Sequence, residues 1–208
     1  MSNLPAARRI MLKGAGDTAM QPGGRVIWIT GLSGAGKTTL AQALLPHLPQ
    51  PRLLLDGDAL RDALCLLAGG YTREDRLKLA LTYARLAELA SDQGVTVVCA
   101  TISMFHEVHK WNRKNLSGYC EIYLDVPEHV RKQRDYKKVY LEREAVVGET
   151  LTPELPLYPD LRLYPEHTTP EYCVSIIVEY IDKLGFPDNS AKNHIRESSE
   201  IEGRKCHC

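Results

Sequence analysis

Short apolar runs alternate with stretches of helical periodicity along most of this chain. Four runs have the length and the continuous apolar character of buried strands, at residues 26–30, 53–56, 95–101 and 120–126. Apolar strands separated by helical segments are typical of a parallel sheet that helices cover on both faces. The pattern therefore predicts an α/β fold.

Two helices are predicted with their ends. Residues 73–92 carry apolar side chains at helical spacing, and Thr72 and Asp75 are placed as an N-terminal cap pair. A second helix opens at Thr169-Pro170 and is expected to stop at Gly185.

A phosphate-binding loop follows the first predicted strand. Residues 31–38 read GLSGAGKT, which matches glycine, four residues, glycine, lysine and Ser/Thr in full, and the context is strand, loop, helix. Glycines let successive N–H groups point at one anion, and the helix starting near Lys37 adds the positive end of its dipole. Lys37 would reach the β- and γ-phosphates of ATP, and the Thr38 hydroxyl would ligate Mg²⁺. The residues expected to bind the nucleotide are Gly31, Ser33, Gly34, Ala35, Gly36, Lys37, Thr38 and Thr39.

A second polar motif, Asp56-Gly57-Asp58, follows the second predicted strand, with Arg61 one helical turn after Asp58. A carboxylate here can hold a Mg²⁺-bound water or accept a proton from an alcohol, and the arginine can clamp an anionic substrate. Alone, Asp-Gly-Asp is a common turn. The third strand ends without an acid, so the metal role of such an acid falls to Asp56 and Asp58. We expect the phosphate loop, this motif, residues 101–103 and Asp125 to converge beyond the carboxyl ends of the strands.

The composition limits the partners and the cellular compartment that we expect for this protein. With 26 basic and 26 acidic residues the net charge is zero, which gives no electrostatic case for a nucleic-acid or membrane partner. Six scattered cysteines suit buried thiols in a reducing compartment, so we expect a cytoplasmic protein. One domain is expected at 25–186, between a flexible extension at 1–24 and a flexible tail at 187–208. That tail holds Ile201-Glu202-Gly203-Arg204, which has the form of an engineered protease site.

Together the motifs resemble the adenylyl-sulfate kinase family, which phosphorylates the ribose 3′-hydroxyl of adenosine 5′-phosphosulfate. The resemblance runs from about residue 26 to residue 178 and rests on GLSGAGKTTLA, LLLDGDALRDAL, GYTREDR, ATIS and EIYLDVPEHVRKQRD. It implies a P-loop kinase with three α/β/α layers, a mostly parallel five-stranded sheet and a short lid. It also implies ATP and Mg²⁺ as cofactors, a small-molecule nucleotide substrate, and it allows a homodimer.

The resemblance assigns roles as well. Lys37, Asp58 and Arg134 would be catalytic, and Thr38 with Asp58 would hold the metal. Tyr71 would replace the family's base-stacking phenylalanine. The residues implied to bind the acceptor are Asp56, Asp58, Arg61, Tyr71, Arg76, Ile102, Ser103, Phe105 and Lys138.

The chain departs from the family at the acceptor side. Leu79 stands where the family has an asparagine, the two arginines that follow it are absent, and Met104-Phe105-His106 replaces proline, an aromatic and arginine. A site built for hydrogen bonds rejects a ligand when leucine replaces its donors, so we expect adenosine 5′-phosphosulfate to be a poor substrate. The segment ISMFHEVHKWNR is similar to that of kinases linked to surface-polysaccharide decoration, and cytidine diphosphoramidate is the alternative acceptor. A nucleotide-dependent switch or an inactive kinase-like module is the alternative of another class.

Several other polar residues have more than one interpretation. His106 and His109 either touch the acceptor or carry protons, or they lie on a solvated or hydrogen-bonded helix face. The basic run at 131–138 is typical of a solvated helix face, from which only Arg134 is expected to reach the phosphoryl group. Three prolines at 153–159 predict a stiff, extended loop.

Overall fold

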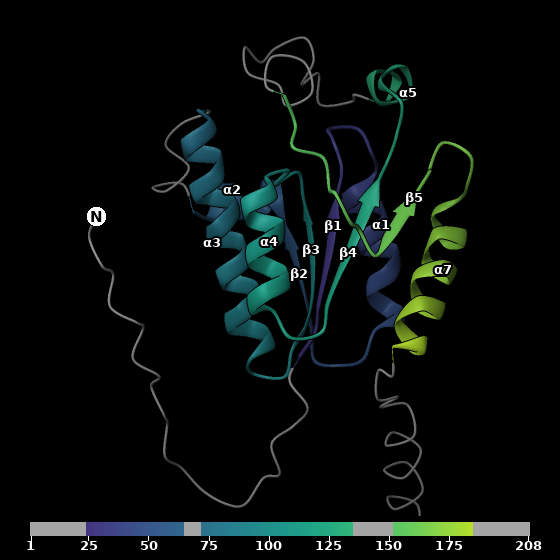
Figure 1. Ribbon diagram of the computed structural model, residues 1–208. Coiled ribbons are helices and arrows are strands. Elements are labelled where there is room, and N and C mark those ends of the chain that lie inside the picture. The colour runs from purple at the N-terminus through teal and green to yellow at the C-terminus, as the bar shows by residue number, and fades with distance from the viewer. Residues whose placement is uncertain (1–23, 65–71, 135–151, 185–208) are drawn as a thin grey trace, which may run out of the picture.

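A parallel sheet of five strands lies at the centre of the computed structural model, which describes residues 24–64, 72–134 and 152–184. The strand order is β2-β3-β1-β4-β5, and every pairing is parallel (Figure 1). The strands are β1 (Val26–Thr30), β2 (Arg52–Asp56), β3 (Thr96–Thr101), β4 (Tyr119–Leu124) and β5 (Leu161–Leu163). The predicted α/β architecture is confirmed, with the phosphate loop after the central strand.

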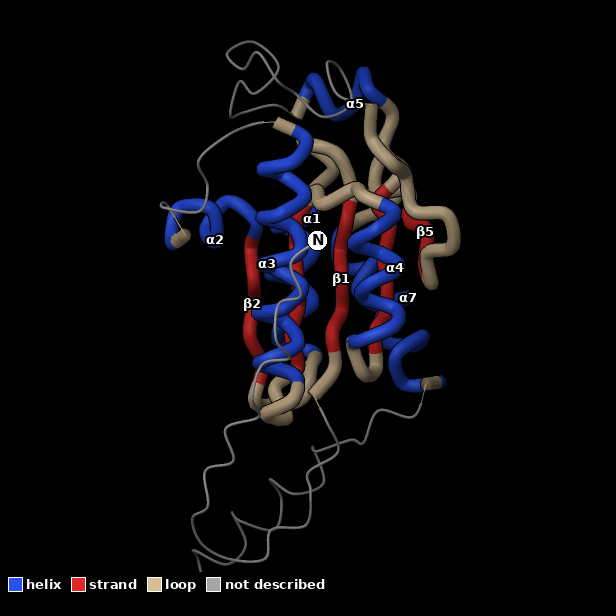
Figure 2. The backbone as a smooth tube through the Cα atoms, turned by 60° about the vertical axis from the view of Figure 1, so that its left-hand side comes forward, coloured by secondary structure: helices blue, strands red, loops and turns tan. Residues whose placement is uncertain are grey.

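Helices cover both faces of the sheet, as Figures 1 and 2 show from two directions. One face carries α3 (Arg73–Ser91) and α4 (His106–Asn115), and the other carries α1 (Lys37–Leu44) and α7 (Pro170–Lys183). Alternate residues of β1 serve the two cores: Trp28 packs on the α3 and α4 side, and Ile27 packs on the α1 and α7 side. The shorter helices are η1 (Leu45–His47), α2 (Gly57–Ala63) and α5 (Glu128–Gln133).

The predicted strands agree with the observed ones to within two residues, because each is a continuous apolar run. The fifth strand, Leu161–Leu163, was not located in the sequence, since it is three residues long and follows the proline-rich segment. It pairs with β4 through Ile122, Tyr123 and Leu124.

The cap pair predicted for α3 is present. Thr72 Oγ1 accepts a hydrogen bond from Asp75 N at 3.2 Å and donates to Asp75 Oδ2 at 2.7 Å, so the helix begins where expected. Thr169 caps α7 in the same way, through Tyr172 N at 3.3 Å. That helix ends at Lys183, and the predicted stop at Gly185 lies outside the described residues.

Three cysteines lie in the described part of the chain, and all three are buried free thiols: Cys99, Cys120 and Cys173. Burial raises the pKa of Cys120 to about 12, so the group stays a neutral thiol at physiological pH. None of the described helices is long and apolar enough to span a membrane.

Candidate active site

The carboxyl ends of the strands bring the predicted chemistry to one edge of the sheet. Register pairs Thr30 at the end of β1 with Thr101 at the end of β3, and Asp56 at the end of β2 with Ala100. The phosphate loop, the Asp56-Gly57-Asp58 motif and the exit of β3 therefore follow three neighbouring strands at one level, at the top of the sheet in Figure 1. This is the convergence expected from the sequence.

The phosphate loop has the backbone that anion binding needs. Gly34 has φ +77 and Gly36 has φ +90, a left-handed conformation that side chains rarely adopt. Gly36 is the N-cap of α1, where no side chain caps the helix and no acid occupies its first turn. The amides of that turn are thus placed as donors for a phosphate group.

Helix α5 packs against this loop. A Cβ built on Gly34 would lie 2.6 Å from the carbonyl oxygen of Arg131. Arg131 is buried, and its Nε donates to the Val126 carbonyl at 3.0 Å. The interpretation of residue 131 as part of a solvated basic face is therefore wrong, because its side chain turns back onto the chain that enters α5.

Oxygen ligands for a magnesium ion meet beside the loop. The Thr38 hydroxyl donates to Asp56 Oδ2 at 2.7 Å. Asp56 Oδ1 accepts from the main-chain N–H groups of Asp58 and Ala59 at 3.0 Å and 3.3 Å, so Asp56 also caps α2. Hydroxyl and carboxylate oxygens are the donors that Mg²⁺ prefers, and this pair fits the ion. Lys37 Nζ donates across the loop to the Leu32 carbonyl at 3.0 Å.

Asp58 lies in the first turn of α2 with an exposed side chain, and Arg61 is one turn further on. Tyr83 of α3 ties this helix down by donating from its hydroxyl to the Gly57 carbonyl at 3.1 Å. Burial raises the pKa of Tyr83 to about 12, with a contribution from the charges of Asp58 and Asp56 that Arg61 opposes. The tyrosine is therefore a neutral donor that holds the Asp58 segment in place.

The exit of β3 forms a turn fixed by hydroxyl groups. Thr30 Oγ1 donates to the Ile102 carbonyl at 2.5 Å, and the hydroxyls of Thr101 and Ser103 are hydrogen-bonded at 2.8 Å. Ser103 has φ +29, the only positive value at a non-glycine residue in the described part of the chain. Backbone conformations of this kind cluster at ligand sites.

Beyond this turn, Glu154 fastens the proline-rich segment to α4. Its carboxylate accepts from Arg73 Nη2 at 2.5 Å and from the main-chain N–H of His106 at 2.8 Å. Partial burial alone would raise the pKa of Glu154, but these hydrogen bonds outweigh it and lower that pKa. The Arg73 guanidinium also lies over the ring of Phe105, 5.5 Å from its centroid.

The remaining predicted residues are more dispersed. Arg76 is half-buried in the first turn of α3, and exposed Arg134 donates to the Pro165 carbonyl at 3.3 Å. Asp125 Oδ2 forms an ion pair with Arg162 Nη2 at 2.5 Å. Tyr71, Lys138 and the predicted lid lie outside the described residues.

Leu79, the main departure from the family pattern, is 5% exposed in the core between α3 and the sheet. Its cluster includes Trp28 and Tyr83. The residue contributes apolar packing there and offers no hydrogen-bond donor.

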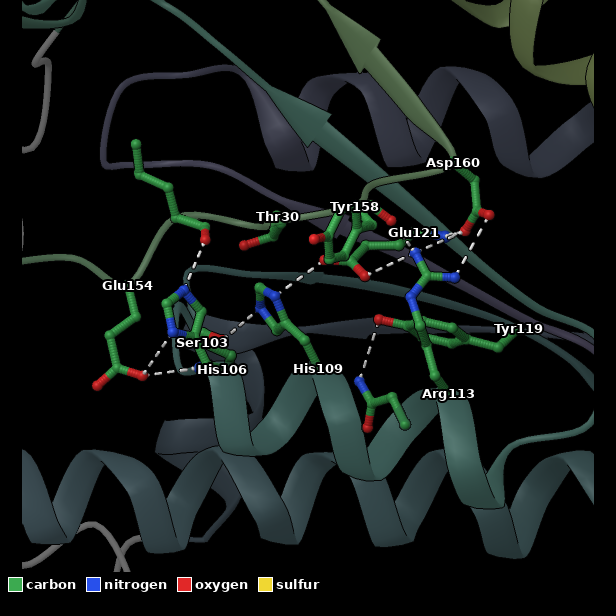
Figure 3. Close-up of polar contacts among 12 residues, drawn as sticks. Thr30, Ser103, His106, His109, Arg113, Tyr119, Glu121, Glu154, Tyr158 and Asp160 are labelled. Atoms are coloured by element: carbon green, nitrogen blue, oxygen red, sulfur yellow. Dashed lines mark hydrogen bonds and ion pairs between the residues drawn. The ribbon is translucent and has the colours of Figure 1, made fainter.

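Sequence reasoning missed a buried charge network behind the turn, drawn in Figure 3. Glu121 of β4 is 1% exposed, with Oε1 2.9 Å from His109 Nδ1 and Oε2 3.1 Å from Arg113 Nη2. Asp160 lies 3.2 Å from the same arginine and accepts from Glu121 N at 2.7 Å. An acid inside an apolar strand, with a histidine and an arginine four residues apart on the preceding helix, is the signal that could have found it.

The parallel sheet, the glycine-rich loop before α1 and the hydroxyl and carboxylate oxygens beside it define a P-loop kinase. The family model for adenylylsulphate kinase matches residues 23–163, and the chain belongs to this family.

Relatives and solved structures agree with this assignment. The chain is 45% identical over 118 residues to a cytidine diphosphoramidate kinase of Campylobacter jejuni, a match covering 55% of this chain and 68% of that protein. It is 40% identical over 148 residues to an adenylyl-sulfate kinase of Deinococcus deserti, covering 67% and 81%. The structure of the Mycobacterium tuberculosis APS kinase CysC in complex with AMPPNP and APS is similar with a TM-score of 0.69 and 28% identity, covering 77% of this chain and 99% of that one.

The protein is therefore an ATP-dependent phosphotransferase of a family that uses ATP with Mg²⁺. The loop amides with Lys37 suit the triphosphate, and Thr38 with Asp56 suits the metal ion.

Proposed function

We propose that this kinase phosphorylates the ribose 3′-hydroxyl of a nucleotide that carries a small anionic group on its 5′-phosphate, and that the acceptor is cytidine diphosphoramidate. The observation that carries this choice is the 45% identity to a cytidine diphosphoramidate kinase over 118 residues. The departure at Met104-Phe105-His106 supports it, because that segment follows Ser103 in the turn after β3. Leu79 supports it only through the hydrogen-bond donor that it lacks, since its side chain packs in the core.

On the ATP side, the loop amides and Lys37 bind the β- and γ-phosphates and stabilise charge that develops during transfer. Thr38 and Asp56 would hold the magnesium ion, which would supply charge neutralisation for the phosphates when bound. Catalysis of this kind depends on positioning more than on covalent chemistry.

On the acceptor side, Asp58 orients the 3′-hydroxyl and accepts its proton. Its exposed side chain stands at the start of α2, next to the Asp56 carboxylate that caps the same helix. Arg61 and Arg76 clamp the 5′ anion, since any nucleotide anhydride presents one. Ile102, Ser103 and Phe105 line the base and ribose side.

A coupled assay of ADP release tests the proposal, with ATP, Mg²⁺ and either cytidine 5′-diphosphoramidate or adenosine 5′-phosphosulfate as acceptor. We expect the ratio of kcat/KM to favour the cytidine compound by about 10²-fold or more, the scale of discrimination when a polar contact is missing. A 3′-deoxy form of the preferred acceptor is the matched control, and it should give no acceptor-dependent turnover.

Three outcomes contradict the proposal in different ways. Efficient turnover of adenosine 5′-phosphosulfate, with a kcat/KM of about 10⁵ M⁻¹s⁻¹ or above, identifies an adenylyl-sulfate kinase. That second function is favoured by the 40% identity over 148 residues. Acceptor-independent ADP release indicates a nucleotide switch, and the absence of turnover with every acceptor indicates a binding module.

A further inference from the structure

The turn after β3 is held in an unusual conformation by a buried histidine. His109 of α4 is 6% exposed, and its Nε2 lies 3.2 Å from the carbonyl oxygen of Ser103, the residue with φ +29 (Figure 3). A strained residue persists only where its surroundings over-determine it. Here the hydroxyl of Thr101 fixes the Ser103 side chain, and His109 fixes its carbonyl.

Both ring nitrogens of His109 face oxygen atoms. Nε2 faces the Ser103 carbonyl and Nδ1 lies 2.9 Å from Glu121 Oε1. A carbonyl oxygen only accepts, so Nε2 carries the N–H that donates to Ser103.

Charged side chains pack on the Nδ1 side of the histidine. Glu121 lies between His109 and Arg113, and Asp160 lies against the far side of Arg113. In the described part of the chain His109 Nδ1 and Glu121 Oε1 approach to 2.9 Å without a directed hydrogen bond, so the carboxylate packs against the edge of the ring. A buried carboxylate of this kind needs cationic partners.

We infer that His109 is a positioning residue of the acceptor site: paired with Glu121, it holds the Ser103 carbonyl and so fixes the turn that presents Ile102, Ser103 and Phe105 to the acceptor. The inference rests on the proposed function, because these three residues are proposed there to bind the acceptor. His109 itself acts through Ser103 and needs no contact with the nucleotide.

A purely structural role has a different signature from a positioning role. Loss of general stability would lower Tm and the fraction of folded enzyme, and so the apparent kcat, while a general loosening of the active site would raise the KM for ATP and for the acceptor alike. Loss of the turn would change acceptor binding alone, since the phosphate loop lies after β1 and is held by other contacts.

The experiment uses the full chain with His109→Phe, which removes both ring nitrogens, and His109→Gln, which keeps an N–H donor. Lys110→Gln, at the neighbouring exposed position of α4, is the matched control. KM and kcat are measured separately for ATP and for cytidine 5′-diphosphoramidate, acceptor affinity is measured by calorimetry without ATP, and Tm is recorded for each variant.

We expect His109→Phe to raise the acceptor KM and Kd by about tenfold or more, as for a buried carbonyl left without its donor, with the ATP KM within about twofold of wild type. His109→Gln should raise the acceptor KM by about threefold, because its amide can replace the donor to Ser103 but not the packing of the ring against Glu121. A folded Gln variant with wild-type acceptor KM overturns the inference, so the decision does not depend on the Phe variant folding. Parallel increases in both KM values also overturn it.

The wild-type measurement separates this inference from the proposed function. A wild-type protein without acceptor-dependent ADP release contradicts both. Wild-type turnover combined with variants that show no selective acceptor defect contradicts the positioning role alone.

Discussion

Thr38 and Asp56, eighteen residues apart, are joined by a hydrogen bond of 2.7 Å from the threonine hydroxyl to the carboxylate Oδ2. The contact ties the first turn of α1 to the end of β2. Because Asp56 Oδ1 also caps α2, one carboxylate connects the phosphate loop with the Asp58 segment. This arrangement favours Asp56 over Asp58 as the partner of Thr38 at the metal ion.

Asp56→Asn separates these two roles of the carboxylate. Asparagine is as good an N-cap as aspartate, so α2 should remain folded and Tm should change little. The lost charge should weaken magnesium binding, because Mg²⁺ prefers anionic oxygen ligands. We expect a higher Mg²⁺ concentration for half-maximal rate, measured by titration at saturating ATP. Unchanged Mg²⁺ dependence would show that Asp56 serves only as a cap.

Lys37→Ala should abolish most phosphotransfer without unfolding the protein. The side chain makes a 3.0 Å hydrogen bond to the Leu32 carbonyl, a minor contribution to stability. Its ammonium group near the β- and γ-phosphates is a preorganised charge, and losing one such group typically costs about 10²- to 10³-fold in rate. Turnover and thermal unfolding are measured on the same sample. A folded variant with near-normal turnover contradicts the assigned role of the phosphate loop.

The sequence predicts most of the fold because local signals there agree with the tertiary contacts. β1 to β4 are continuous apolar runs, and Thr72 with Asp75 mark the start of α3 through contacts three residues apart. Leu161–Leu163 carries no such signal, because its strand character depends on pairing with β4.

The candidate site also has one part that the sequence predicts and one part that it does not. The phosphate loop and Asp56 can be predicted because their chemistry depends on the spacing of residues along the chain. The contacts of Glu121 with His109 and Asp160 join residues 12 and 39 positions apart, and no local pattern specifies them. The expectation that Arg131 lies on a solvated helix face is wrong for a similar reason, since a run of basic residues does not show which side chain turns inward.

Asp58→Asn should lower turnover far more than it weakens ATP binding. We place Asp58 at the acceptor hydroxyl, and loss of a general base typically costs about 10²- to 10⁴-fold in kcat. Steady-state kinetics at saturating acceptor, combined with a direct ATP binding isotherm, distinguish the two effects. A variant that binds ATP poorly yet reacts normally at saturation would place Asp58 on the nucleotide side.

Gly34→Ala and Gly36→Ala form a matched pair within the phosphate loop. Both force an alanine into a left-handed conformation, at a cost of about 1 kcal/mol. The new Cβ at 34 would also lie 2.6 Å from the Arg131 carbonyl, whereas at 36 no atom lies within 4 Å. We expect Gly34→Ala to lower Tm further than Gly36→Ala, measured without nucleotide. Equal decreases in Tm would mean that α5 moves away from the new Cβ without loss of stability.

Leu79→Asn tests whether the departure at residue 79 belongs to the core or to the acceptor site. Leu79 is 5% exposed and packs in the cluster that contains Trp28 and Tyr83, so an asparagine amide there would lose its hydrogen bonds to water. Burying an unsatisfied amide and losing the apolar contacts should cost about 2–4 kcal/mol. Leu89→Asn on the same helix, where the side chain is 60% exposed, should cost about 0.5 kcal/mol. Urea denaturation of both variants gives the comparison. A small loss at 79 would mean that the amide finds water or a partner, which would place that position at the wall of the acceptor site and make it a direct determinant of acceptor choice.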